Sequence, residues 1–220
     1  MKADLHVHST YSEDGKQTVP EILERCHLLG FGALAITDHN AIGSWEEAAR
    51  ENKYGIILIR GVEVSTSEGH LLALGVSGPV PKGMGVQETI DHVHRDGGIA
   101  VAAHPYRAWS GLGAENVRGK TFDAVEAING RSLRWSNAGA IRLAKEMGVG
   151  ETGGSDAHHQ VSLGRAFTIL PDDCATESDV LKAIVERRTS AAGRHRSFFG
   201  FLYFGVKSVL KWTGRGFKRI

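Results

Sequence analysis

Residues 3–8 read Ala-Asp-Leu-His-Val-His, a short apolar run that ends in two histidines. On an extended strand, residues i and i+2 point to the same side, so the imidazoles of His6 and His8 can bind one ion together. Further short apolar runs follow, and their many β-branched residues are typical of buried parallel strands. These runs are 33–36, 56–64, 71–76, 99–103, 124–128 and 166–170, with a weaker, glycine-rich one at 149–153.

Helix signals lie between these runs. Thr18-x-x-Glu21 and Ser44-x-x-Glu47 both match the capping box, in which side chains bind the first free N–H groups of a helix. Gly148 stands where a helix with an apolar period at 138–147 is expected to end. About seven strand–helix units result, which favours an α/β barrel of the (βα) TIM-like type over an open doubly wound sheet. The open sheet remains the alternative, because periodicity alone does not show closure.

The composition is that of one globular domain with an appendage. The chain has 220 residues, of which 41% are hydrophobic and 23% charged, and its formal net charge is +1. Two cysteines, Cys26 and Cys174, are too few for a disulfide scaffold or a cysteine-rich zinc module. The first residues lack the pattern of a secretory signal, and no apolar run reaches about 20 residues. We therefore expect a cytoplasmic protein.

The charge is divided unevenly. Residues 187–220 contain nine Lys or Arg and no Asp or Glu, so the rest of the chain is acidic. We expect a barrel over residues 1–190 and a basic, aromatic, helical tail over 191–220. Residues 197–220 suit a peripheral membrane helix, and docking on the barrel or on a second subunit is the equal alternative. Nucleic acid is a third partner for the tail and is not favoured.

Histidines and carboxylates follow the predicted strands. The carboxyl ends of all strands in a parallel barrel meet on one face, so these residues should converge. They offer nitrogen and oxygen and no thiolate, a set that suits Zn²⁺, Mn²⁺ or Fe²⁺. One ion takes three or four protein ligands, so the set implies two or three ions, bridged by Glu63 or Asp156. The candidates are His6, His8, Asp14, His39, Glu63, His70, His104, Asp156 and His158.

Five motifs resemble the PHP (polymerase and histidinol phosphatase) domain family. The likeness runs from about residue 4 to 170 and is greatest to stand-alone phosphoesterases related to nucleoside 3′,5′-bisphosphate phosphatase. The motifs are HVH at 6–8, TDHN at 37–40, GVEVS at 61–65, AHP at 103–105 and GSDAH at 154–158. The resemblance implies a distorted seven-stranded α/β barrel with a trinuclear centre of Zn, Mn or Fe.

The resemblance also implies a division of the ligands among three ions. His6, His8, Glu63 and Asp156 would hold the first, Asp14, His39 and His158 the second, and Glu63, His70 and His104 the third. Asp14 is aligned with the family's carboxylate because it precedes Gly15, and Glu13 remains its rival. Many relatives carry a large insertion between the segments of His70 and His104, where this chain has 33 residues. Substrate identity therefore cannot be carried over.

The predicted activity is hydrolysis of a phosphate monoester, either a small phosphorylated metabolite or a nucleotide, by metal-activated hydroxide. Glu63, Asp156 and His158 are the predicted catalytic residues, and Arg107 is predicted to bind phosphate through two N–H groups. A plain surface arginine is the alternative for Arg107, and the acid that protonates the leaving group stays open. An exonuclease or other nuclease is the alternative function; a non-catalytic binding module and an amidohydrolase are less favoured.

Overall fold

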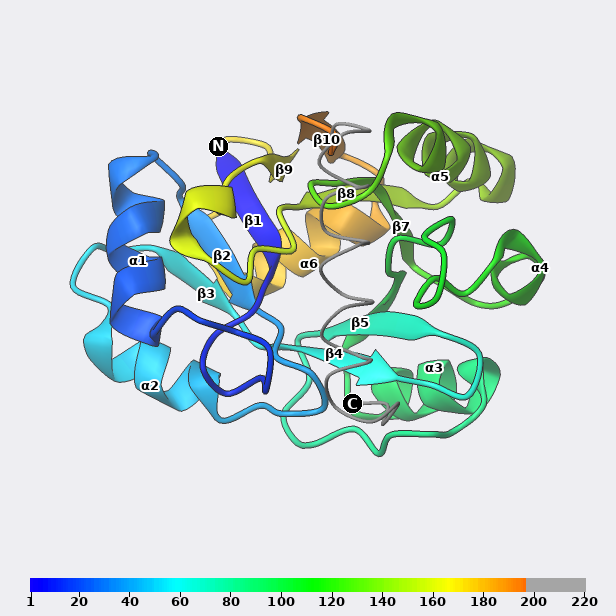
Figure 1. Ribbon diagram of the computed structural model, residues 1–220, viewed down its shortest axis with the longest axis horizontal. Helices are drawn as coiled ribbons and strands as arrows, with labels where there is room; N and C mark the ends of the chain where they lie inside the picture. Colours follow the sequence, from blue (N-terminus) through cyan, green and yellow to red (C-terminus); the bar gives the residue numbers. More distant parts are fainter. Residues whose placement is uncertain (197–220) are drawn as a thin grey trace, which may run out of the picture.

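The computed structural model describes residues 1–196, which form two five-stranded mixed β-sheets and six α-helices (Figure 1). The strands are β1 (Lys2–Val7), β2 (Ala33–Ile36), β3 (Ile57–Ile59), β4 (Gly61–Ser65), β5 (His70–Leu74), β6 (Ile99–Ala102), β7 (Ala124–Asn129), β8 (Gly150–Gly154), β9 (Ala166–Ile169) and β10 (Ser190–Gly193). The helices are α1 (Val19–Leu28), α2 (Ser44–Glu51), α3 (Val86–Arg95), α4 (Ala114–Val117), α5 (Arg134–Met147) and α6 (Glu177–Val185), with a 3-10 turn, η1, at Gln160–Ser162.

The expected seven-stranded TIM-like barrel is wrong. The strand orders are β10-β9-β1-β2-β3 in one sheet and β4-β5-β6-β7-β8 in the other. Strands β4, β5 and β6 pair antiparallel, as do β1, β9 and β10. The reason lies in the connections: β4 and β5 are joined by a short turn rather than by a helix, and a pair joined in this way must run antiparallel.

The apolar run 56–64, expected as one strand, is divided between the two sheets at Arg60. The backbone N–H of Arg60 donates to Oε1 of Glu177 at 2.6 Å, and its Nη1 lies 2.9 Å from Oε2 of the same carboxylate. A Cβ on Gly61 would come within 2.8 Å of Cγ2 of Thr37. The missing side chain therefore lets the backbone pass close to β2 as it enters the second sheet.

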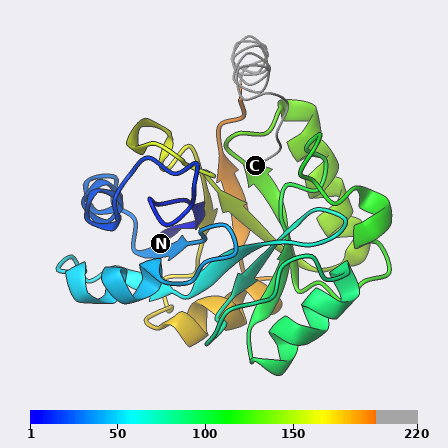
Figure 2. The ribbon, with the colours of Figure 1, turned by 60° about the horizontal axis from the view of Figure 1, so that its bottom comes forward.

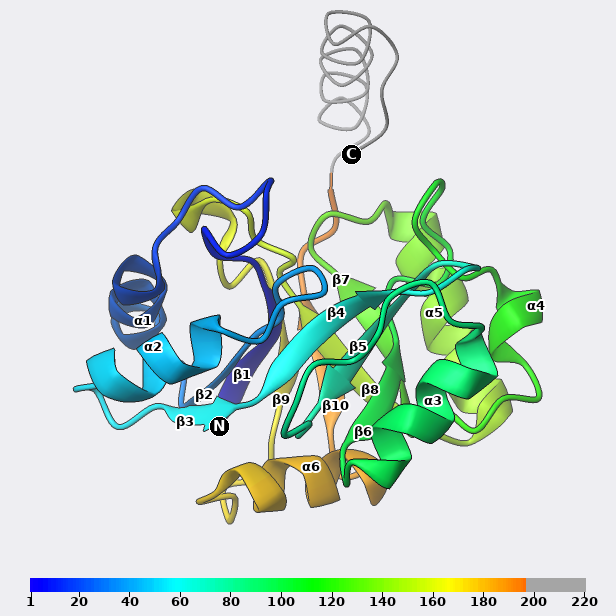
Figure 3. The same ribbon diagram turned by 90° about the horizontal axis from the view of Figure 1, so that it is seen from below.

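Helices cover the outer faces of the sheets, and the strands lie at the centre (Figures 2 and 3). Helices α1 and α2 pack on the first sheet, where Ile22 contacts the cluster that contains Leu34. Helices α3 and α5 pack on the second, through Ile90 and Leu143. Helix α6 covers one end of the interior, where Ile184 joins an apolar cluster that draws residues from both sheets.

A β-bulge in β1 turns the two histidines of HVH into the interior. Asp4 pairs with Leu34 and Val7 with Ile36, so β1 has one more residue than β2 over this stretch. Before the bulge, Leu5 points into the interior cluster; after it, Val7 points outward beneath α1. The extra residue reverses the alternation, which is a common effect of bulges beside functional sites. The functional stretch of β1 therefore faces the space between the sheets.

Local helix signals are confirmed in part. Thr18 and Glu21 form the expected capping box of α1, and Gly148 ends α5 in the left-handed conformation at φ 66°. The second expected capping box is wrong, because Gly43 is the N-cap of α2 and Ser44 is already helical. Sequence analysis also missed strand β10, which is short and flanked by polar residues.

Within residues 1–196, no helix is both long and apolar enough to cross a membrane. The helix expected over residues 197–220 lies outside the described residues.

Candidate metal centre

The nine predicted ligands converge where the two sheets meet. Isolated parallel bridges join Val7 to Ala157 and His39 to Glu63, and these bridges bring the strand ends of both sheets together. Four overlapping groups, each with ligand atoms within 4.8 Å of one another, contain all nine residues. The groups are His8, Asp14, His39 and His158; His6, His104 and Asp156; His6, His8 and Glu63; and His39, Glu63 and His70.

Glu63 occupies the middle of this cluster. It is 1% exposed, and five imidazole nitrogens lie 2.8–3.3 Å from its carboxylate oxygens. Oε1 faces His70 and His104, whereas Oε2 faces His6, His8 and His39. Burial favours a raised pKa for Glu63, but the surrounding imidazoles, His6 foremost, hold that pKa well below its usual range. The carboxylate is therefore negative and has one group of imidazoles at each oxygen.

Asp156 connects the histidines to two arginines. Its Oδ1 lies 3.6 Å from Nε2 of His8 and 3.1 Å from Nη1 of Arg131. Its Oδ2 lies 2.6 Å from Nη1 of Arg107. Burial acts to raise the pKa of Asp156, and the guanidinium groups of Arg107 and Arg131 nevertheless hold it well below its usual range. Arg107, predicted to bind phosphate, thus contacts a predicted ligand and stays a predicted substrate-binding residue.

Asp14, rather than Glu13, belongs to the cluster. Oδ2 of Asp14 lies 2.8 Å from Nε2 of His158 and 4.0 Å from Nε2 of His39. Burial favours a raised pKa for Asp14, yet His158 keeps it below the usual range. Glu13 is exposed and takes part in none of the four groups.

Two of the nine residues have backbones in the left-handed region. His104 has φ 29° and Asp156 has φ 52°, values that cost a non-glycine residue about 1–3 kcal/mol. Each lies two residues beyond the end of a strand of the second sheet, His104 after β6 and Asp156 after β8. Such conformations persist where the surroundings fix them, and they gather at functional sites. Here both residues belong to one of the four groups, together with His6.

A carboxylate fixes the ring of His6. Oε1 of Glu126 lies 2.9 Å from Nδ1 of His6, so with a metal bound Nδ1 would keep its proton toward Glu126, and Nε2, on the side of Glu63, would be the nitrogen that binds the ion. Glu126 also accepts from the backbone N–H of His104 at 2.9 Å and from the side-chain amide of Asn129 at 3.0 Å. A carboxylate behind a histidine in this way is the usual support of a metal-ligating imidazole.

His8 has an indirect counterpart of this support. The Ser12 hydroxyl donates to Oδ1 of Asp38 at 2.8 Å, so its oxygen is left to accept. Nδ1 of His8 lies 3.2 Å from that oxygen, and the backbone N–H of His39 lies 2.9 Å from it. Asp38, through Ser12, therefore places the proton on Nδ1 and the lone pair on Nε2 of His8.

The residues fit a group of divalent cations. Eight buried side-chain polar atoms in the described residues make no hydrogen bond, and two of them belong to this cluster, Nδ1 of His104 and Oδ1 of Asp14. Such atoms are costly unless a further partner satisfies them. The donors are imidazole and carboxylate, the set that Zn²⁺, Mn²⁺ and Fe²⁺ accept, and Nε2 of His6 and Nε2 of His8 lie 3.2 and 3.1 Å from the same oxygen of Glu63.

Sequence analysis missed Arg131 and Asn129. Nη1 of Arg131 lies 2.9 Å from both ring nitrogens of His158, and Asn129 donates to Oδ2 of Asp156 at 3.2 Å. The signal was present: Asn129 ends β7 and Arg131 follows it by two residues. The rule that strand ends gather the functional groups, used for the other strands, would have found both.

A buried cluster of histidines and carboxylates at the strand ends of an α/β fold is typical of metal-dependent hydrolases. Comparison with known sequences gives the family. The family model described as PHP domain matches residues 4–126, more than half of the chain, and the one described as PHP-associated matches residues 134–189. The chain belongs to the PHP domain family, which confirms the family and the enzyme class expected from the sequence.

Individual relatives resemble this chain at moderate or low sequence identity. An uncharacterized protein of Methanocaldococcus jannaschii is 36% identical over 140 residues, which are 59% of this chain and 82% of that protein. The 3′,5′-nucleoside bisphosphate phosphatase of Chromobacterium violaceum is 40% identical over 83 residues, 36% of this chain and 29% of the phosphatase. A two-domain protein of Bacteroides vulgatus, containing a predicted PHP-like metal-dependent phosphoesterase, has a TM-score of 0.70 at 20% identity, over 88% of this chain and 65% of that one.

Proposed function

We propose that this protein hydrolyses a phosphate monoester, carried by a small metabolite or a nucleotide, with two or three Zn, Mn or Fe ions held by the nine clustered residues. The observation that carries the proposal is Glu63, whose two carboxylate oxygens face separate groups of imidazoles. A carboxylate in that position suits a bridge between neighbouring ions.

Bound divalent ions supply a water of lowered pKa and a positive charge opposite the phosphate oxygens. The chain's own residues do the rest. Glu126 and the Ser12–Asp38 pair keep the Nε2 lone pairs of His6 and His8 directed inward. Arg107 binds an equatorial oxygen of the phosphate in our proposal, since a guanidinium offers two parallel N–H donors. His158, near Asp14 and 10% exposed at its side chain, is our candidate for the leaving-group proton.

Some relatives of this chain are named as enzymes that act on phosphorylated small molecules, and another is named as an exoribonuclease. We favour the small molecule, because the cluster is largely buried and the side chains of His6 and Glu63 are at most 2% exposed. A nuclease activity at the same centre is the alternative. A cytoplasmic location and a membrane or docking contact through residues 197–220 stay predictions.

The test is hydrolysis of a panel of phosphate monoesters and of labelled oligonucleotides, with chelated protein and after reconstitution with Mn²⁺ or Zn²⁺. We expect metal-dependent release of phosphate from one or more monoesters. Release of nucleotides from the oligonucleotides alone would favour the nuclease, and no turnover with any metal would refute both functions.

A further inference from the structure

A pocket lined by three arginines adjoins the candidate metal centre. It has a volume of about 210 Å³ and lies where the ends of β6 and β7 meet the first turn of α5. Its lining includes three arginines, an aromatic ring and two serines. These are Arg107, Arg131, Arg196, Trp135, Ser132 and Ser136.

The pocket and the metal centre share two side chains. Arg107 and Arg131 line the pocket, and both also contact Asp156, at 2.6 and 3.1 Å. Asp156 in turn lies 3.6 Å from Nε2 of His8. A molecule bound in the pocket would therefore be separated from the metal-binding histidines only by the side chain of Asp156. One end of it could lie in the pocket and the other at the metal centre.

The pocket is rich in positive charge. Guanidinium groups stay protonated in proteins, and Asp156 is the single carboxylate shared by Arg107 and Arg131. Burial, together with the nearby Arg131 and Arg107, lowers the pKa of Arg196 to about 10. Like charges gathered around a cavity favour an anion inside it, and arginine matches phosphate and carboxylate oxygens especially well.

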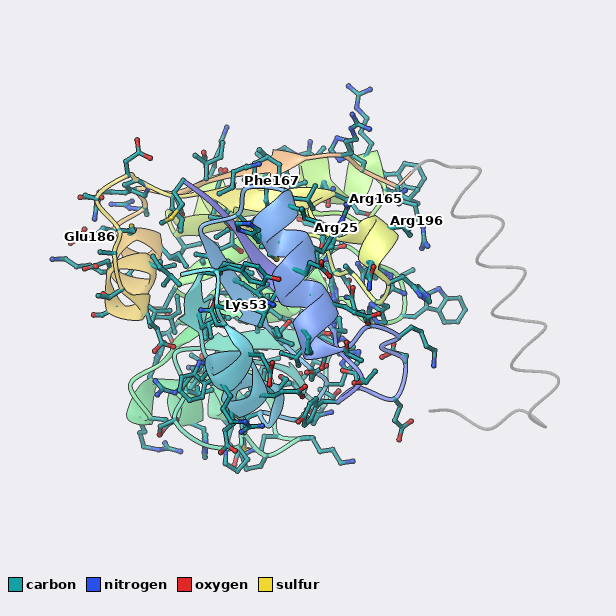
Figure 4. All side chains as sticks on the ribbon, turned by 90° about the vertical axis from the view of Figure 1, so that its left-hand side faces the viewer. Arg25, Lys53, Arg165, Phe167, Glu186 and Arg196 are labelled. Atoms are coloured by element: carbon teal, nitrogen blue, oxygen red, sulfur yellow. The ribbon has the colours of Figure 1, made fainter. Side chains whose placement is uncertain are left out.

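The third arginine comes from the far end of the described chain. The backbone N–H of Arg196 donates to the carbonyl of Ser132 at 2.9 Å, and a β-bridge pairs Arg196 with Leu133. Figure 4 shows Arg196 on the same side of the molecule as Arg165, one of the residues whose charge acts on it. Arg131 and Arg196 both lie outside the segments matched by the two family models, 4–126 and 134–189. These two arginines are therefore a feature of this chain that those family segments do not cover.

The wall of the pocket suits the organic part of a ligand. Trp135 is 60% exposed and Tyr106 is 37% exposed, and both line the pocket. An indole beside guanidinium groups accepts a flat or apolar group by stacking, while the cations hold its charge. The pocket thus presents contacts for both the charge and the body of an organic anion.

We propose that this pocket is a subsite for a second anionic group of the substrate, a phosphate or a carboxylate borne by the same molecule as the phosphate that is hydrolysed. The body of the substrate then lies against Trp135. The proposal rests on the proposed function, because the second anion is defined relative to the hydrolysed phosphate.

The first test compares matched substrates. A nucleoside 3′-monophosphate and its 3′,5′-bisphosphate differ by one phosphate, and glycerol phosphate and phosphoglycerate differ by one carboxylate. We expect kcat/KM to be at least tenfold higher for the doubly anionic member of one pair, and the pair concerned identifies the anion. In Arg196→Gln this preference should fall about tenfold, and Arg196→Lys should retain part of it. Arg142→Gln removes the same charge from an exposed position on α5 and should leave the preference unchanged.

The second test does not depend on catalysis. Calorimetric titration of chelator-treated protein with AMP should show binding that weakens at least tenfold in Arg196→Gln and not in Arg142→Gln, with adenosine as the uncharged control. Arg196-dependent AMP binding without turnover of any substrate would refute the proposed function and leave the subsite standing. Equal kcat/KM within both pairs, or AMP binding indifferent to Arg196→Gln in a variant that melts like the wild type, would overturn the subsite.

Discussion

Glu126 and Glu63 contact opposite nitrogens of the buried His6 ring: Oε1 of Glu126 lies 2.9 Å from Nδ1, and Oε2 of Glu63 lies 3.2 Å from Nε2. The first contact fixes the tautomer, and the second identifies the nitrogen that is left to bind a metal. Glu126 is the acceptor in its hydrogen bonds with the His6 ring, the His104 backbone N–H and the Asn129 amide. Both carboxylate oxygens therefore act as acceptors.

Glu126→Gln should weaken metal binding about 10–100-fold. The amide must turn its NH₂ toward one of three donors, which are the His6 ring, the His104 N–H and the Asn129 amide. Calorimetric titration with Mn²⁺ or Zn²⁺ measures the effect. Glu146→Gln, at a half-exposed surface ion pair with Arg118, is the control. Equal affinities in the two variants would contradict the role of Glu126.

Ser12→Ala should also weaken metal binding, because it removes the oxygen that accepts from Nδ1 of His8 and from the backbone of His39. Ser9→Ala is a matched control, since the Ser9 hydroxyl donates to the same Asp38 carboxylate at 2.7 Å, whereas the ring of His8 is hydrogen-bonded to Ser12. We expect the affinity for Mn²⁺ to fall several-fold more in Ser12→Ala than in Ser9→Ala. A larger effect of Ser9→Ala would show that Asp38 acts on the loop and not on His8.

Gly154→Ala should damage the site through shape alone. A Cβ at this position would lie 2.3 Å from Cβ of His6 and 2.9 Å from Oε1 of Glu126, so β8 and β1 would have to separate. We expect a loss of about 1–3 kcal/mol in the free energy of unfolding and weaker metal binding. Gly78→Ala, where a Cβ meets nothing within 4 Å, should change neither quantity. Denaturant titration of both variants decides the matter.

Glu63→Gln should lower the rate of phosphate release by at least about a thousandfold, because a neutral amide cannot replace a carboxylate shared by two groups of imidazoles. Elemental analysis should show that the variant retains at least one equivalent less metal than the wild type. Its circular dichroism spectrum should match that of the wild type. Wild-type rates in a folded Glu63→Gln protein would refute the assignment of Glu63.

Protein purified without chelator should contain more than one equivalent of divalent metal. Removal of the metal should lower the melting temperature. A ligand that binds only the folded protein adds about 2.7 kcal/mol to the free energy of unfolding when its concentration is 100 times its Kd. Thermal melts over a series of Mn²⁺ and Zn²⁺ concentrations measure this. A metal content near zero that persists after reconstitution, with melting indifferent to metal, would contradict the candidate centre.

Sequence analysis brought the nine candidates together because strand ends gather side chains whether the strands form one barrel or two sheets. His70 shows the limit of that rule: it begins β5 instead of ending it, and it reaches Glu63 because β5 runs antiparallel to β4. The closed barrel failed because a short apolar run such as 56–64 does not reveal that it changes sheets at Arg60. The pairing partner of a strand is set by distant residues, and no local pattern encodes it.

The bulge in β1 was equally hidden. Strict alternation would have put Val7 on the side of Leu5, with His6 and His8 facing α1. The extra residue appears only against the register of β2, where Ala35 alone stands opposite two residues of β1. Arg196 was hidden for a similar reason, because its approach to Ser132 joins segments more than 60 residues apart.

The groups around Glu63 come from both sheets. His6, His8 and His39 belong to β1, β2 and the segments after them, whereas Glu63, His70 and His104 belong to β4, β5 and the end of β6. An ion held there would link the two sheets through its ligands. Its full set of ligands exists only after both halves of the chain have docked. A bound ion would therefore couple the two sheets, so amide exchange along β1 and β4 should slow together when the metal is present.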